Sequence, residues 1–415
     1  MAQTPEQLVA ERKQRLLDVY AMKQPDRVPI SFGLGYMLAK ISGITHQELD
    51  TNPDKAQELL EKWALYFQPD AITGQGLYVS PPSVILGDRQ TKWPGFGLPP
   101  DQPFQFVEGE YMKIEEYDDF LADPTNFTLR KFLPRAFKEL EGLADLPWIP
   151  ILMIGYQALP FIGRLNMPSV AASLKALARA AEWYAETAAR GRKNAERMNA
   201  LGFPTGIGAG PLVMAPFDFM SDTMRGMRGI FLDMYRRPDK VIAACERARK
   251  IVADVTIQAC KLSGAKFCTI PLHRGSDGFM SIEQFETFYW PSFKGLMLDI
   301  VEAGIMPVPF YEGVWDDRLH YLNEFPKGKT GGRFQSSNMF KVKEVCGDNM
   351  VLTGGFPVSV LQGGTPEQVR QLTKEFCEQV AKGGGYIMGT NTAMDECSPE
   401  LVKVWVDATK EYGVY

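Results

Sequence analysis

The sequence predicts an α/β protein: a (β/α)8 TIM barrel with an inserted cap region. Two observations favour this fold class. Eight short apolar runs alternate with helical patterns along the 415 residues, and seven of these runs end in glycine or have one within the next three residues. Such alternation is typical of a parallel sheet with right-handed crossovers, and eight units fit a barrel of about 250 residues before insertions. A doubly wound open sheet is the alternative, but the sequence has neither a G-x-G-x-x-G after the first strand nor a Walker loop.

Each expected strand is a short apolar run bounded by glycine, proline or charged residues, the pattern of a strand buried on both faces. The expected strands are 28–33, 70–76, 205–210, 266–272, 306–311, 330–335, 350–354 and 385–388. Helices are expected where apolar residues recur at helical spacing, as Leu8, Leu16 and Tyr20 do in the first one. The expected helices are 4–22, 54–67, 238–263, 281–303, 316–324, 338–346, 365–382 and 399–411.

The residues in excess of a minimal barrel lie mainly at about 77–203. Pro81–Pro103 is rich in proline and glycine and is expected to be loop, whereas Pro168–Ala200 is alanine-rich and is expected to be one long helix. We interpret this insertion as a cap beside the barrel mouth, so that residues 1–415 form a single domain.

The charge balance excludes several classes of partner. Lys and Arg number 45 and Asp and Glu 50, a net charge of −5, which disfavours nucleic acid and anionic membranes because both need a basic surface. The polar N-terminus lacks a signal core, and the longest uncharged run, 146–163, contains three prolines, so no membrane-spanning helix is expected. Six scattered cysteines without a C-x-x-C pair indicate free thiols in a reducing cytoplasm.

Three side chains near the strand ends are the first candidates for chemistry, because a barrel places its site there. His273 directly follows a strand and is either a metal ligand or acid–base group, or a structural histidine. Glu312 follows the next strand, where a buried carboxylate needs a metal or an ion pair with Arg318 or Lys343. Cys397 precedes the last helix, whose N-terminus favours the metal-binding thiolate, although it could be a bystander.

The strand-end motifs together resemble the uroporphyrinogen decarboxylase superfamily. The resemblance covers roughly residues 1–76 and 201–415. The segments that carry it are 271–281, 288–291, 307–313, 354–357, 363–367, 383–387 and 411–415. It implies a (β/α)8 barrel with its site at the C-terminal mouth, and one of two chemistries.

True decarboxylases of the superfamily lose CO₂ without a cofactor. They anchor substrate carboxylates with arginines after strand one and use an aspartate at the end of strand two. Here residues 28–36 contain no arginine, Gln75 lies near the place of the aspartate, and the late histidine of the family aligns near Asn391. An anionic porphyrinogen needs cationic anchors, so the resemblance argues against this substrate.

The other branch moves methyl groups to or from a corrinoid carried by a separate protein. It binds zinc through His-x-Cys at the end of strand five and a later cysteine. Glu312 takes the position of one ligand here, which implies zinc held by Glu312, His273 and Cys397. A carboxylate with a histidine makes a harder zinc, which suits an ether or phenolic oxygen and therefore an O-demethylase-type methyltransferase.

The resemblance thus implies a cytoplasmic methyltransferase that uses zinc, a small methylated, especially methoxylated, substrate and a corrinoid protein as partner; a homodimer is left open. The expected catalytic residues are His273, Asp277, Glu312 and Asn391. The expected substrate-binding residues are Gln75, Phe217, Arg274, Tyr311 and Gln335. Two alternatives stay open: a cofactor-free decarboxylase of a porphyrinogen or a smaller acid, anchored by Arg274 and Arg333, and a non-catalytic binding barrel.

Overall fold

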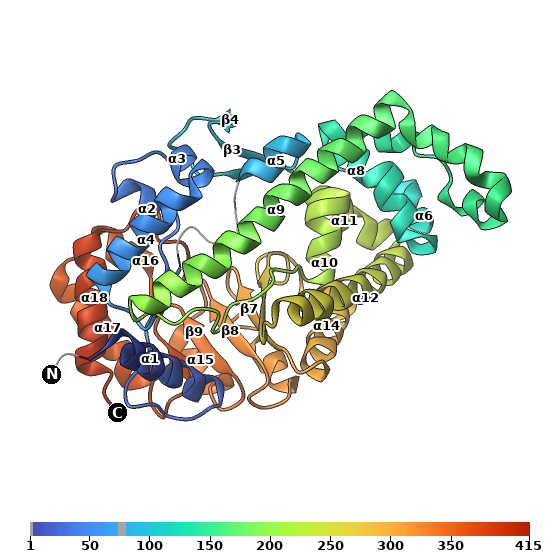
Figure 1. Cartoon of the computed structure of the whole chain (residues 1–415). Coiled ribbons are helices and arrows are strands. Elements are labelled where there is room, and N and C mark those ends of the chain that lie inside the picture. The colour runs from blue at the N-terminus through green and yellow to red at the C-terminus, as the bar shows by residue number, and fades with distance from the viewer. Residues whose placement is uncertain (1–2, 74–79) are drawn as a thin grey trace. The chain divides into compact units, whose positions relative to one another are not determined.

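The computed structural model describes residues 3–73 and 80–415, so the predicted site residue Gln75 lies outside the described residues. The chain forms two compact units. Unit 1 comprises Met1–Tyr78, Lys193–Asp218 and Ala248–Tyr415, and unit 2 comprises Val79–Arg192 and Phe219–Arg247. Figure 1 shows the chain with many of these elements labelled. Segments that are 3₁₀- or π-helical carry the label η.

Unit 1 holds the parallel sheet that the sequence predicts. Its strands are β1 (Ser31–Gly33), β2 (Ala71–Thr73), β6 (Phe267–Leu272), β7 (Met306–Tyr311), β8 (Gly331–Phe334), β9 (Val351–Gly354) and β10 (Tyr386–Ile387). β1 pairs with β2, and β6 to β10 pair in chain order, every pair being parallel. Parallel bridges from Ile30 to Met388 and from Leu212 to Thr269 join β1 to β10 and the chain near Leu212 to β6. These eight strand positions confirm the predicted (β/α)8 barrel.

The third strand position differs from the prediction. The expected strand at 205–210 is irregular, and backbone pairing with β6 occurs instead at residues 211–213. Gly206 and Gly208 have φ of 75° and 71°, a left-handed conformation that ends a strand. The glycines of this run therefore form a turn, and the pairing begins only after them.

The helices of unit 1 cover the sheet in the expected order. They are α1 (Pro5–Tyr20), α2 (Met37–Lys40), α3 (His46–Thr51), α4 (Pro53–Phe67), α10 (Pro216–Asp218), α13 (Ile282–Gln284), η6 (Phe285–Tyr289), α14 (Trp290–Glu302), η7 (Leu319–Glu324), α15 (Met339–Cys346), α16 (Val358–Gly363), α17 (Pro366–Glu375), η8 (Phe376–Val380) and α18 (Pro399–Tyr412). The single helices expected at 281–303 and 365–382 each contain a π-helical turn, η6 and η8.

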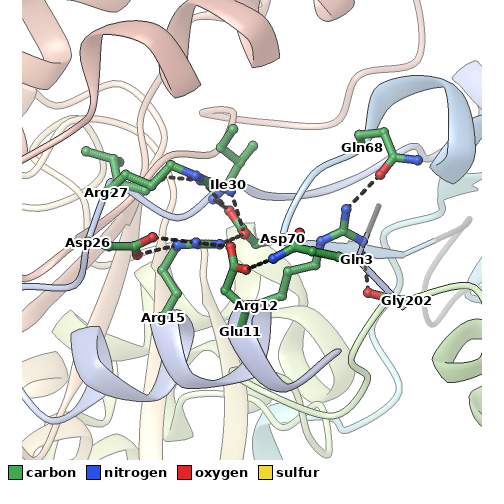
Figure 2. A network of polar contacts seen from close by, with 11 residues as sticks. Gln3, Glu11, Arg12, Arg15, Asp26, Arg27, Ile30, Gln68, Asp70 and Gly202 are labelled. Atoms are coloured by element: carbon green, nitrogen blue, oxygen red, sulfur yellow. Dashed lines mark hydrogen bonds and ion pairs between the residues drawn. The ribbon is translucent and has the colours of Figure 1, made fainter. Parts of the chain in front are cut away.

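A buried polar network joins α1 to the N-terminal ends of the first strands (Figure 2). Asp70, which is fully buried, accepts hydrogen bonds from Arg15 at 2.6 Å, from two nitrogens of Arg27 at 2.8 Å each, and from the Ile30 amide at 2.8 Å. Arg15 also pairs with the exposed Asp26 at 2.6 Å. The network therefore lies at the N-terminal ends of β1 and β2, the end that a barrel uses for stability, whereas its chemistry belongs at the C-terminal ends.

Unit 2 contains most of the predicted insertion. Its elements are α5 (Ser80–Leu86), β3 (Thr91–Pro94), β4 (Gly97–Leu98), β5 (Gln105–Phe106), η1 (Ile114–Glu116), α6 (Tyr117–Ala122), α7 (Pro124–Phe127), η2 (Thr128–Phe132), α8 (Leu133–Ala136), η3 (Lys138–Asp145), η4 (Ile149–Asn166), η5 (Phe219–Arg225) and α11 (Gly226–Arg236). Two long helices, α9 (Pro168–Ala200) and α12 (Pro238–Ser263), run through both units. The predicted long helix is confirmed as α9, but 81–103 is wrong as a simple loop because it contains most of α5 and the two short strands β3 and β4.

No single helix in the described ranges is both long and apolar enough to cross a membrane. The pair η3 and η4, bent by 60° at their junction, passes the same test by length and composition alone. All six cysteines lie in the described ranges, are buried and form no disulfide. They are Cys245 in unit 2, and Cys260, Cys268, Cys346, Cys377 and Cys397 in unit 1.

Candidate active site at the barrel mouth

The register of β6 and β7 brings two of the predicted residues together. Leu272 pairs with Tyr311, so that His273 and Glu312, the next residue of each strand, leave the sheet side by side. His273 Nε2 lies 3.5 Å from Glu312 Oε1, and the side chains keep 26% and 32% of their exposure. A half-exposed imidazole beside a carboxylate at the C-terminal end of barrel strands can carry and release a proton.

Asp218, in α10, fixes the position of His273 and was missed by the sequence reasoning. Its carboxylate is fully buried and accepts the backbone N–H groups of His273 at 3.0 Å and Arg274 at 2.9 Å. The Tyr289 hydroxyl donates to the same carboxylate at 2.8 Å. An acidic residue inside the apolar run Phe217–Met220 is the signal that could have identified it, because a buried carboxylate requires donors.

Arg333, on β8, supplies a cation near the pair. Its Nε donates to the Thr390 carbonyl at 3.1 Å, and its guanidinium lies 4.7 Å from the centre of the Phe310 ring. Burial lowers the pKa of Arg333 to about 10, and the charge of Glu312 opposes this shift. Arg333 therefore stays protonated at neutral pH.

Asp277 holds two loops together. One carboxylate oxygen pairs with Arg318, which is buried, and the other accepts the Asp317 amide at 3.2 Å. The Asp277 amide in turn donates to the Val314 carbonyl at 2.8 Å. Arg318 thus pairs with Asp277 and not with Glu312, the partner considered from the sequence. With both oxygens engaged, Asp277 positions the loops after β6 and β7.

Asn391 and Gln335 are also engaged with backbone groups. Asn391 Oδ1 accepts the Val358 amide at 3.0 Å, and its Nδ2 donates to the Gln335 carbonyl at 3.0 Å. The Gln335 side chain accepts the Gly313 amide at 2.7 Å. These contacts connect the loops that follow β7, β8, β9 and β10. The two amides therefore set the shape of the barrel mouth.

The predicted aromatic substrate contacts are core residues. Phe217 is fully buried and packs on Tyr289 at 5.8 Å between ring centres. Tyr311 is also fully buried, stacks on Phe334 at 4.6 Å, and has its pKa raised by burial. Arg274, by contrast, is partly exposed, with its guanidinium 5.1 Å from the centre of the Phe279 ring.

Cys397 lies in a different environment from the one expected. Its Sγ is buried, 3.9 Å from the Val358 carbonyl. Burial, reinforced by the charges of Asp395 and Glu396, raises the pKa of Cys397 to about 12. This burial opposes the thiolate that the helix N-terminus was expected to favour. Cys397 lines a cavity with Lys40 that neither His273 nor Glu312 lines.

The described side chains do not assemble the predicted three-ligand zinc site. Two neighbouring ligands of a tetrahedral zinc, each about 2.1 Å from the metal, lie about 3.4 Å apart, and the 3.5 Å between His273 and Glu312 fits that spacing. A catalytic zinc takes three protein ligands, however, and in residues 3–73 and 80–415 no group of three His, Cys, Asp or Glu could hold a metal. The described residues therefore do not fit a catalytic zinc.

Comparison with solved structures supports the fold. A methyltransferase from Methanosarcina mazei matches with a TM-score of 0.61 and 16% identity, over 97% of this chain and 98% of that chain. A B12-independent methionine synthase from Shewanella sp. W3-18-1, in complex with selenomethionine, matches with a TM-score of 0.34 and 12% identity, over 48% of this chain and 60% of that chain. The second score is too low to carry an argument. No curated protein matches the chain.

A family model, uroporphyrinogen decarboxylase (URO-D), matches residues 204–412, which is just over half of the 415-residue chain. The matched range contains β6 to β10 and the loops with His273, Glu312 and Asp218. The chain therefore belongs to the uroporphyrinogen decarboxylase family.

Proposed function

We propose that the protein is a methyltransferase that moves a methyl group from a small methoxylated molecule to the corrinoid of a partner protein. The observation that carries the proposal is the His273–Glu312 pair, with 3.5 Å between Nε2 and Oε1, at the open end of the barrel. The fold shared with the Methanosarcina mazei methyltransferase is consistent with it.

The His273–Glu312 pair can supply the proton donor that cleavage of an ether requires. A methyl–oxygen bond is stable at neutral pH because the leaving alkoxide or phenoxide is poor, so a proton must reach that oxygen as the bond breaks. In the proposal His273 donates this proton, and Glu312 stabilises the imidazolium before transfer. The corrinoid, when its carrier protein docks, supplies the nucleophile that takes the methyl group. Asp218 and Tyr289 hold the loop that carries His273.

A test uses the full chain with cob(I)alamin and a panel of methoxylated aromatics, followed by the colour change on cobalt methylation. We expect Glu312→Gln and His273→Gln each to lower the rate by roughly 10²- to 10⁴-fold. Glu324→Gln is the matched control, since Glu324 is an exposed carboxylate paired with Lys294 and should leave the rate unchanged. No methylation with any ether, amine or thioether, even with a cognate corrinoid protein, would refute the proposal.

Metal analysis of the same proteins separates two forms of the site. Zinc bound at one per chain in the parent and lost in Glu312→Gln would mean that Glu312 is a ligand and that the pair recruits a third ligand in solution. An equal zinc content in parent and variant would exclude Glu312 as a ligand.

Decarboxylation of a small acid is the second candidate, and Arg333 is the observation that favours it. A partly buried guanidinium near the mouth can anchor a substrate carboxylate. Release of CO₂ from small carboxylic acids, abolished by Arg333→Gln, would support this alternative over methyl transfer. We expect no formation of coproporphyrinogen from uroporphyrinogen in either case, because no arginine lies in residues 28–36.

A further inference from the structure

Unit 2 exposes an apolar segment, residues 146–167, whose side chains would be unusual on a surface that only contacts water. η4 forms most of it and lies at one end of unit 2, coloured green before the start of α9 in Figure 1. Met153 and Tyr156 keep 88% and 80% of their exposure. Other exposed apolar side chains of the segment are Trp148, Ile154, Leu159 and Ile162. Contiguous exposure of this kind marks a protein or membrane interaction site.

The two ends of the apolar segment are fastened to each other. The Ser169 hydroxyl donates to Asp145 at 3.0 Å, and the Ser173 hydroxyl donates to the Glu139 carbonyl at 2.8 Å. A Cβ on Gly142 would lie 2.0 Å from the Ser169 carbonyl oxygen, so η3 and the start of α9 are in close contact. The chain therefore leaves and re-enters unit 2 at one place, and the segment projects as a closed excursion.

This geometry suits insertion into one leaflet and not a crossing. Gly155, with φ of 71° and ψ of −140°, interrupts η4, and Pro160 lies inside it. A spanning helix needs about 20 continuous apolar residues, whereas an interfacial segment buries its side chains only about 5–10 Å deep. Trp148 and Tyr156 are residue types that prefer the interface.

The net charge around the segment is positive, opposite in sign to the net charge of the whole chain. Residues 146–181 contain Arg164, Lys175 and Arg179 and no aspartate or glutamate, although the net charge of the protein is −5. All three cations are exposed, and Lys175 and Arg179 lie one turn apart on α9. The Arg130 guanidinium lies 4.9 Å from the centre of the Trp148 ring.

We propose that the apolar segment inserts into a membrane surface rich in anionic headgroups, with Arg164, Lys175 and Arg179 bound to those headgroups. The combination of apolar side chains with cations and without acids is the one that anionic lipid attracts. A second copy of the chain fits less well, because a twofold interface would place the same cations opposite one another. This proposal replaces the expectation, drawn from net charge alone, that no membrane is a partner.

The test is flotation of the full-length protein with vesicles of phosphatidylcholine and phosphatidylglycerol, and with vesicles of phosphatidylcholine alone. We expect the protein to bind the anionic vesicles. Its partitioning to the neutral vesicles should be weaker by roughly tenfold or more. The double variant Met153→Glu, Ile154→Glu should lower anionic binding by on the order of tenfold or more. Leu262→Glu is the matched control, because Leu262 is 90% exposed in unit 1 and should bind as the parent does.

Far-UV circular dichroism establishes that each variant is folded before comparison. Removing charge in the triple variant Arg164→Gln, Lys175→Gln, Arg179→Gln should bring anionic binding down to the neutral level. Equal binding of the parent to the two kinds of vesicle, or binding to neither, would overturn the proposal. Undiminished binding of the Met153 and Ile154 variant would overturn it as well. So would a dimer in analytical ultracentrifugation that this variant dissociates, since a second copy would then cover the segment.

Discussion

Replacing Asp70 by asparagine should destabilise unit 1 strongly, because this buried carboxylate pairs with two guanidinium groups. Asp70 is fully buried, and Arg15 and Arg27 donate three hydrogen bonds to it at 2.6–2.8 Å (Figure 2). Asparagine keeps the shape but removes the charge and turns one acceptor into a donor. Removing one partner of a buried ion pair costs about 3–5 kcal/mol.

The assay is urea unfolding followed by far-UV circular dichroism, together with hydrogen exchange of the β1 and β2 amides to assign the loss to unit 1. Asp26→Asn is the matched control: Asp26 also pairs with Arg15, but its side chain is 63% exposed, so we expect a loss of about 1 kcal/mol or less. A loss below about 1 kcal/mol for Asp70→Asn, or equal losses for the two variants, would refute the argument that burial sets the cost.

Three further predictions rest on single carboxylates. Asp218→Asn should lower stability by about 1.5–3 kcal/mol in urea unfolding, because an amide nitrogen then faces backbone donors; a neutral effect would contradict the role we give Asp218. Arg135 lowers the pKa of Glu116 to about 2 from 4.5, so its stabilisation is present above pH 4.5 and lost toward pH 2. Because solvent screens this partly exposed cluster, Glu116→Gln should cost on the order of 1–2 kcal/mol at pH 7 and nothing near pH 2, as thermal melts across pH would test. Burial raises the pKa of Asp395, so its ionised form costs stability. Asp395→Asn should melt higher than the parent at pH 7 but not below about pH 4, and a lower melting temperature at pH 7 would disprove this.

The sequence predicts the strands well where apolar runs are uninterrupted, as in β6 and β7, because burial on both faces leaves few polar positions. It does not predict the register of these strands, which decides that His273 and Glu312 become neighbours. The run 205–210 was wrong as a strand, since the conformation of its glycines depends on tertiary packing and not on local hydropathy.

The site residues divide in the same way. A polar residue directly after a barrel strand can be recognised from the chain, and His273 and Glu312 are of this kind. Asp218 and Asn391 act through hydrogen bonds to loops distant in sequence, at His273 and Gln335, and those partners are visible only in the fold. The burial that raises the pKa of Cys397 arises from packing in three dimensions, which the local sequence does not show.

Because all six thiols are buried, their reaction with a thiol reagent measures how often the structure around each cysteine opens. A thiol reagent modifies only the exposed thiolate, and burial raises the pKa of Cys268, Cys346 and Cys377 to about 12. Labelling of the native protein must therefore wait for a fluctuation that exposes the sulfur. Cys245 belongs to unit 2 and the other five belong to unit 1. Mass spectrometry of the labelled cysteines would consequently time the unfolding of each unit separately, without any engineered probe.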